Sequence, residues 1–139
     1  MINIITGFGK TGEYLSQHRL VNKISFTGST EVGYLIMRNC HKHNLKPVTL
    51  ELGGKSANII LPDADLDDAV GQACILFANC GQSCIAGSRT YVHKSIYKPF
   101  VEKCIAIANG IKVGDPFSAD SQLGAIISKE QFEKVLGYI

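Results

Sequence analysis

Short strand-like and helix-like segments alternate along the whole chain, and this alternation constrains the fold more than any other feature. Apolar runs between turn residues mark strands, whereas apolar residues three or four positions apart mark helices. The alternation predicts an α/β fold with parallel strands. The predicted strands cover residues 2–6, 23–27, 48–52, 57–61 and 89–93, and the predicted helices cover residues 13–18, 29–40, 65–80, 95–110 and 128–139.

A pair of glycines, Gly53 and Gly54, follows the alternating strand at residues 48–52. Because paired glycines after a buried strand are typical of a domain boundary, we predict one domain over residues 1–52 and another over residues 53–139. Residues with N-cap potential precede four of the predicted helices: Ser29 or Thr30, Asp65 or Asp67, Ser95, and Ser128.

The composition is that of a globular protein, with 45% hydrophobic and 19% charged residues. A formal net charge of +2, with scattered Lys and Arg, provides no basic patch for a nucleic acid. No apolar run approaches the roughly 20 residues of a membrane helix, and the first residues lack the features of a signal peptide. We therefore expect no nucleic-acid partner and no membrane partner.

Five cysteines without a CxxC pair argue against a disulfide framework and for a reducing compartment. We take this compartment to be the cytoplasm. The four histidines lack the ligand spacing of a zinc site, so we expect no metal. Cys84 follows a loop signal, Gly81-Gln82-Ser83, whereas three cysteines fall on apolar helix faces, where we expect them to pack in the core: Cys40, Cys74 and Cys104.

The segment GFGKTG, residues 7–12, fits the GxGxxG pattern of dinucleotide-binding loops and follows a predicted strand. The acidic residue expected about 20 positions later is not found at the end of the second strand. An ordinary strand-to-helix turn therefore remains an equal alternative for this loop.

A second glycine loop, FTGSTEVG at residues 26–33, opens a predicted helix. Gly28 permits close approach of a ligand to the backbone, and Ser29 could hold a phosphate or simply cap the helix. The segment GGKS, residues 53–56, is not a phosphate loop, because Thr49 stands where the first glycine is required.

Two residues, Cys84 and Glu51, have reactive side chains that the structure of a loop or a strand does not require. Cys84 lies in GQSCIAGSR, between a predicted helix and a predicted strand, where backbone amides can lower a thiol pKa and hold an oxyanion. Glu51 lies in a strand between Leu50 and Leu52, and by alternation it faces away from both. When each residue is considered separately, Cys84 is more safely interpreted as a core cysteine and Glu51 as part of a solvated strand face.

The three motifs together are more specific. FTGSTEVG, LELGGKS and GQSCIAGSR, in this order, resemble the aldehyde dehydrogenase superfamily, and the resemblance extends over the whole chain through DADLDDAV, VGDP and QLG. It is strongest to the enzymes of small aliphatic aldehydes and retinal. It implies the end of a Rossmann-like NAD(P)-binding domain (1–52) followed by the start of an α/β catalytic domain (53–139). The cofactor implied is NAD, with NADP as the alternative, and the whole protein would be a dimer or tetramer.

The resemblance also implies roles for individual residues. Cys84 matches the nucleophile that forms a thiohemiacetal and then a thioester, and Glu51 matches the base that activates the hydrolytic water. The implied cofactor-binding residues are Gly9, in the first glycine turn, together with Phe26, Thr27, Gly28, Ser29, Leu52 and Gly53.

The chain departs from the family pattern in length. Glu51 and Cys84 are 33 positions apart, one fewer than the pattern leads us to expect, and the shortening falls in the predicted helix before Cys80. Motifs that the family has upstream and downstream have no counterpart here. We therefore expect a partial sequence of an enzyme that is inactive alone. Two alternatives are a truncated product with only a binding role and a small, unrelated dinucleotide-binding domain.

Overall fold

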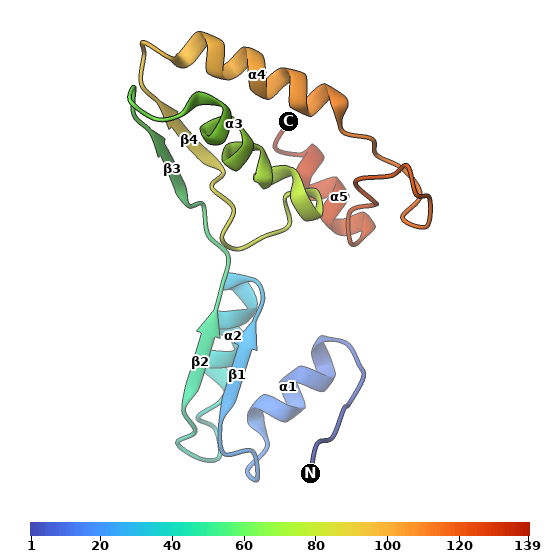
Figure 1. The fold of residues 1–139 in the computed structure, drawn as a ribbon. Helices are drawn as coiled ribbons and strands as arrows, with labels where there is room; N and C mark the ends of the chain where they lie inside the picture. The colour runs from blue at the N-terminus through green and yellow to red at the C-terminus, as the bar shows by residue number, and fades with distance from the viewer. The chain divides into compact units, whose positions relative to one another are not determined.

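The computed structural model describes all 139 residues, which form two compact units, Met1–Gly53 and Gly54–Ile139. Each unit is built on one pair of parallel strands connected through a helix (Figure 1). The predicted α/β class is therefore confirmed. None of the helices has the length and apolar character needed to cross a membrane.

In the first unit, β1 (Ile24–Thr27) and β2 (Val48–Glu51) pair in parallel, and α2 (Thr30–Asn39) forms the crossover between them. The helix α1 (Gly9–Gln17) precedes β1 and contacts α2. Ser29 caps α2 as predicted, because its Oγ accepts a hydrogen bond of 3.2 Å from the Val32 N–H.

The strand predicted at residues 2–6 is wrong. These residues are exposed and form neither strand nor helix. A strand exists through hydrogen bonds to a neighbouring strand, and β1 and β2 pair only with each other. Apolar character alone was therefore not sufficient to make this segment a strand.

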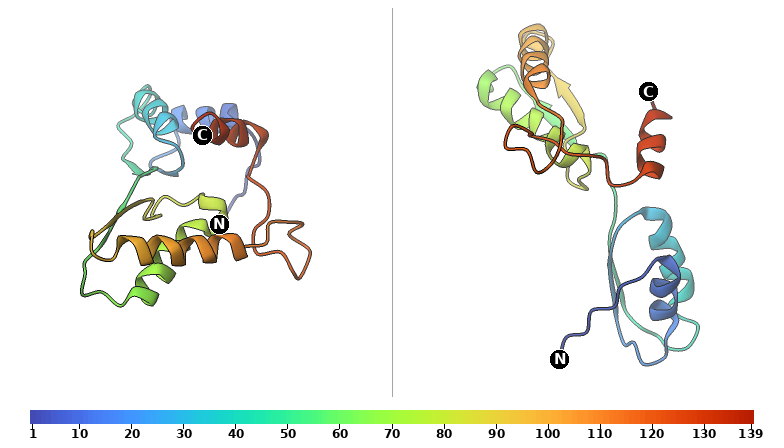
Figure 2. Two further views of the ribbon diagram at one scale, coloured as in Figure 1. Left: turned by 90° about the horizontal axis from the view of Figure 1, so that it is seen from above. Right: turned by 90° about the vertical axis from the view of Figure 1, so that its right-hand side faces the viewer.

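In the second unit, β3 (Ala57–Ile60) and β4 (Arg89–Val92) pair in parallel. α3 (Leu66–Cys74) follows β3, α4 (Tyr97–Gly110) follows β4, and α5 (Lys129–Leu136) lies near the end of the chain. α3 and α4 lie side by side (Figure 2). They bury a small core made of Ile60, Val70, Ala73 and Phe100.

Two helix predictions in the second unit need correction. The helix predicted over residues 65–80 ends at Cys74 and continues as the 3₁₀ segment η1 (Ile75–Gly81), in which Asn79 and Cys80 have left-handed backbone. Ser95 does not cap α4, because its hydroxyl bonds to His93 Nδ1 at 2.8 Å. The cap predicted at Ser128 is confirmed by a 3.2 Å bond from the Gln131 N–H.

Candidate active site

The carboxyl ends of β1 and β2 meet at one edge of the first sheet. Thr27 is opposite Glu51 in the register, and the Gly28 N–H donates a 3.0 Å hydrogen bond to the Glu51 carbonyl. In parallel α/β sheets, ligands bind at this carboxyl edge. The fold therefore brings two groups of predicted residues together, the loop after β1 with Thr27, Gly28 and Ser29, and the end of β2 with Glu51, Leu52 and Gly53.

Glycines at this edge allow unusually close packing. A Cβ on Gly28 would lie 2.4 Å from Cζ of the Phe26 ring, and a Cβ on Gly33 would lie 2.9 Å from Cδ2 of Leu52. Both distances are far shorter than a carbon–carbon contact. A side chain at position 28 would therefore require the Phe26 ring to move, and one at position 33 would require the Leu52 side chain to move.

Glu51 is exposed at the end of β2, whereas Leu50 and Leu52 are half-buried. This is the alternation that the sequence predicts for a strand with one packed face. The Glu51 carboxylate makes no hydrogen bond or ion pair in the structure, so both of its oxygens are free to accept a proton or a hydrogen bond.

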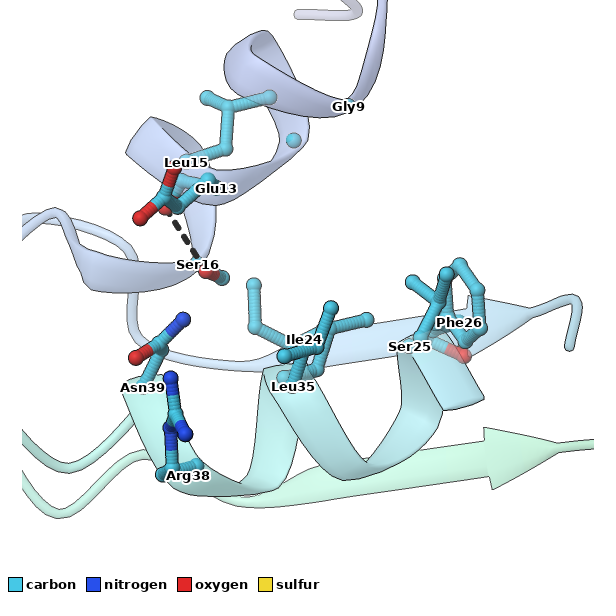
Figure 3. A pocket seen from close by; sticks show the side chains of 13 residues that line it. Gly9, Glu13, Leu15, Ser16, Ile24, Ser25, Phe26, Leu35, Arg38 and Asn39 are labelled. Atoms are coloured by element: carbon cyan, nitrogen blue, oxygen red, sulfur yellow. Dashed lines mark hydrogen bonds between the residues drawn. The ribbon is translucent and has the colours of Figure 1, made fainter. Parts of the chain in front are cut away.

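A groove of about 610 Å³ opens between α1, β1 and α2 (Figure 3). Its walls are mostly apolar, and two of the predicted cofactor residues, Gly9 and Phe26, line it. The full lining comprises Gly9, Gly12, Glu13, Leu15 and Ser16 of α1, Ile24, Ser25 and Phe26 of β1, and Val32, Leu35, Ile36, Arg38 and Asn39 of α2.

Sequence reasoning missed the α2 wall of this groove. Val32, Leu35 and Ile36 form the apolar stripe that marked α2 as a helix, and such a stripe normally packs in a core. In the structure, Val32 is 39% exposed and Leu35 is 45% exposed. The stripe therefore faces an open groove that could accept an apolar ligand.

In the second unit, Cys84 is exposed on the loop between η1 and β4. This loop lies against the segment that follows the glycine pair, since a Cβ on Gly54 would be 3.3 Å from the Cys84 carbonyl oxygen. Arg89 ties the same two segments together. Its Nε donates to the Lys55 carbonyl at 2.7 Å, and its backbone N–H donates to the Ser56 carbonyl at 3.2 Å.

Gln82, two residues before Cys84, holds the loop from the other side. Its Nε2 donates to the Asn79 carbonyl at 3.1 Å, and its Oε1 accepts from the Ile127 N–H at 3.1 Å. Asn79 returns a bond from Nδ2 to the Gln82 carbonyl at 3.0 Å. Sequence reasoning did not assign a role to Gln82, because its partner Ile127 is 45 residues away.

A family model for the aldehyde dehydrogenase family matches residues 1–139. The chain belongs to the aldehyde dehydrogenase family. The resemblance carried by its three motifs is therefore confirmed.

The relatives of this aldehyde dehydrogenase chain include the mitochondrial aldehyde dehydrogenase of Sus scrofa, which is 53% identical over 141 positions that cover the whole chain and 27% of the relative. The mitochondrial benzaldehyde dehydrogenase of Antirrhinum majus is 52% identical and is covered to 26%. The chain thus spans about a quarter of the length of these curated relatives. The alignments are two positions longer than the chain, so this chain has two gapped positions in them.

Solved structures of other aldehyde dehydrogenases are also similar. Gamma-glutamyl-gamma-aminobutyraldehyde dehydrogenase from Burkholderia cenocepacia matches with a TM-score of 0.92 at 48% identity, over 96% of this chain and 28% of that protein. Betaine aldehyde dehydrogenase from Staphylococcus aureus, in complex with NAD+, matches with a TM-score of 0.90 at 42% identity, over 96% of this chain and 27% of that protein. The predicted partial aldehyde dehydrogenase fold is therefore confirmed.

The predicted cytoplasmic location is wrong. Similar aldehyde dehydrogenases from pig, horse, human and snapdragon are mitochondrial by name. The prediction depended on free cysteines, which indicate a reducing compartment but do not distinguish one such compartment from another.

The other cysteines of this aldehyde dehydrogenase chain differ from Cys84 in exposure. Cys40 is fully buried, and Cys74 and Cys104 are half-buried against the core of the second unit. Burial, followed by the neighbouring Cys74 thiol, raises the pKa of Cys104 to about 11. No three side chains of His, Cys, Asp or Glu lie close enough together to hold a metal ion.

Proposed function

We propose that the whole protein containing this chain oxidises small aldehydes to carboxylic acids with NAD(P)+, as a mitochondrial dimer or tetramer. Two features of the structure support this proposal. Most of the predicted cofactor residues lie with Glu51 at the carboxyl edge of β1 and β2. Cys84 is exposed on a loop that lies against Gly54.

The first unit fits a dinucleotide. The apolar walls of the groove, with Gly9 and Gly12 on α1 and Val32 and Leu35 on α2, suit a flat ring such as adenine. Gly28 lets a pyrophosphate approach the start of α2, where free N–H groups favour anions. When bound, NAD(P)+ would supply the acceptor for the hydride of the substrate. NAD is the first choice, since the Staphylococcus aureus relative was crystallised with it.

We propose that Cys84 is the nucleophile. Its thiolate would add to the aldehyde carbonyl and form a thiohemiacetal, which loses a hydride and becomes a thioester. The N–H groups that the loop uses for its own hydrogen bonds belong to Gln82, Ala86 and Ser88, which leaves the Cys84 N–H free to stabilise an oxyanion. In the Staphylococcus aureus relative a cysteine is BME-free, and in a double mutant of that enzyme the same cysteine is BME-modified, so a reactive thiol occurs in the family.

We propose that Glu51 is the base that takes a proton from water as the water attacks the thioester. The products are then the carboxylic acid and the regenerated Cys84 thiol. The position of Glu51 at the end of β2 supports this assignment, because its side chain is exposed and makes no hydrogen bond or ion pair.

The test is turnover of the full-length protein with propanal and NAD or NADP, measured by the absorbance of the reduced cofactor. Cys84→Ala should lower turnover by at least about 1000-fold, and Glu51→Gln should lower it by about 100-fold to 10,000-fold. Cys104→Ala is the matched control and should leave turnover unchanged, because Cys104 packs against the core. Undiminished turnover of Cys84→Ala would refute the assignment of the nucleophile.

A further inference from the structure

Lys46 is a buried lysine without a carboxylate partner. It is only 2% exposed, and its Nζ donates two 2.8 Å hydrogen bonds, to the carbonyls of Ser16 and His18. A buried ammonium group is unfavourable unless charge-assisted hydrogen bonds compensate for the lost water. Lys46 belongs to the segment before β2 and to neither glycine loop, so its burial at the end of α1 has a structural purpose.

The two carbonyls lie at the C-terminal end of α1, where the helix dipole favours a positive charge. α1 has no basic residue in its own last turn, so Lys46 supplies this charge from a distant part of the sequence. Asn44 extends the same attachment. Its Nδ2 donates to the carbonyls of Arg19 and Val21 at 3.0 and 3.1 Å. Asn44 and Lys46 thus bind four carbonyls between residues 16 and 21.

α1 forms one wall of the groove between α1, β1 and α2. Lys46 is hydrogen-bonded to the C-terminal end of this helix. Ser16, whose carbonyl accepts from Lys46, itself lines the groove (Figure 3). The start of α1 has no comparable anchor, because Phe8 at the N-cap makes no side-chain bond. The hydrogen bonds from Lys46 and Asn44 thus attach this wall of the groove at the C-terminal end of α1.

We propose that Lys46 is a positioning residue for cofactor binding: it fixes the C-terminal end of α1 and so holds the groove at the width that the cofactor needs. This inference rests on the proposed function for the role of the groove. It requires no contact between Lys46 and the cofactor.

The experiment uses the full-length protein and three variants. Lys46→Met removes the charge and both hydrogen bonds, Lys46→Arg keeps a charged donor, and Lys23→Met is the control. Lys23 is an exposed lysine next to β1 without a hydrogen bond or ion pair. The measurements are KM for the cofactor, kcat, and backbone amide exchange in residues 9–17.

We expect Lys46→Met to raise KM for the cofactor about tenfold with kcat within about twofold, and to speed amide exchange in α1. Lys46→Arg should recover most of the affinity, and Lys23→Met should behave as wild type. An unchanged KM in Lys46→Met overturns the inference, and so does an equal loss of kcat and affinity in both Lys46 variants. If the wild type neither binds the cofactor nor turns over, the proposed function fails. In that case amide exchange alone still tests the anchoring role, and unchanged exchange in Lys46→Met overturns it.

Discussion

Three consecutive residues shortly before Cys84 have left-handed backbone: Asn79, Cys80 and Gly81, with φ of 53°, 57° and 71°. This conformation is easy for glycine, tolerated by asparagine and unfavourable for cysteine. Cys80 is held in it by its thiol, which donates to the Gly124 carbonyl at 3.4 Å, and by the hydrogen bonds between Asn79 and Gln82. The turn that leads into the loop of Cys84 is therefore strained at one residue, Cys80.

Substitutions at Cys80 separate the effect of this backbone strain on stability from the effect of the hydrogen bond that the thiol donates. Cys80→Ala loses the bond to Gly124 and keeps the strain, whereas Cys80→Gly loses the bond and relieves the strain. We expect Cys80→Gly to be more stable than Cys80→Ala by about 1 kcal/mol, measured from denaturant midpoints of the full-length protein. If the alanine variant is the more stable one, Cys80 does not carry strain in the intact protein.

The raised pKa of Cys104 predicts how its reactivity depends on pH. Only the thiolate is alkylated, and burial, with Cys74 beside it, moves its formation from an ordinary pKa of 9.0 to about 11. The alkylation rate of Cys104 should therefore stay low at pH 9 and rise towards pH 11. Peptide mass spectrometry after brief iodoacetamide treatment measures this rate. A midpoint near 9 would show that Cys104 is accessible and unperturbed.

At the level of elements, locally determined features were predictable from the sequence. The start of α2 at Ser29 and the start of α5 at Ser128 follow from bonds that span three residues. The strand predicted at residues 2–6 was wrong, because a strand depends on a pairing partner that the local sequence does not reveal. The early end of α3 was also missed, since the apolar stripe continues to Cys80 although the backbone leaves the helix at Cys74.

The same distinction applies to the candidate site. Glu51 and Cys84 could be proposed as site residues from the sequence because their motifs are contiguous in it. The sequence did not reveal three further features, because each depends on contacts between distant segments: the groove wall on α2, Gln82 and Lys46. The bonds of Lys46 span 28 and 30 residues, and the bond of Gln82 to Ile127 spans 45.

The turn between β1 and α2 contains Gly28, and a substitution at this position tests how tightly the turn packs against the Phe26 ring. Gly28→Ala would place a Cβ against the Phe26 ring, so the ring must shift. Because this ring lines the groove, the shift would change the groove wall. We expect a stability loss of about 1–3 kcal/mol from overpacking and a higher KM for the cofactor. Thermal unfolding and steady-state kinetics measure the two effects.

The control for this substitution is Gly71→Ala in α3, where nothing lies within 4 Å of the added Cβ. It should leave KM unchanged and raise stability by about 0.5–1 kcal/mol, since alanine favours a helix over glycine. Equal effects of the two alanines would show that the contact between Gly28 and Phe26 is unimportant.

At the scale of the whole molecule, the chain buries little apolar surface. The core of the second unit consists of four buried side chains, and large side chains such as Phe8, Phe117 and Tyr138 are almost fully exposed. Exposed apolar surface of this extent is typical of surfaces that other segments or subunits cover. The chain spans about a quarter of its curated relatives, in which further segments are available to cover it.

We therefore predict that residues 1–139 expressed alone will show no measurable aldehyde oxidation. A misplacement of about 1 Å between the reacting groups can lower the rate about 100-fold. We expect the two small units alone to hold the reacting groups too loosely for this precision. The assay combines the purified chain with propanal and NAD or NADP, beside the full-length protein. Turnover by the chain alone that disappears in Cys84→Ala would mean that these residues suffice.

The most direct test of the proposed chemistry is to trap the thioester. In full-length Glu51→Gln, water should attack the thioester slowly, so mixing with propanal and NAD should accumulate an acyl group on the enzyme. Intact-mass and peptide mass spectrometry would locate it. We predict one propionyl group per active site on the peptide that contains Cys84, and its absence in the double variant Cys84→Ala/Glu51→Gln. An acyl group on Cys80 instead, or turnover without any acyl enzyme in Glu51→Gln, would contradict the roles proposed for Cys84 and Glu51.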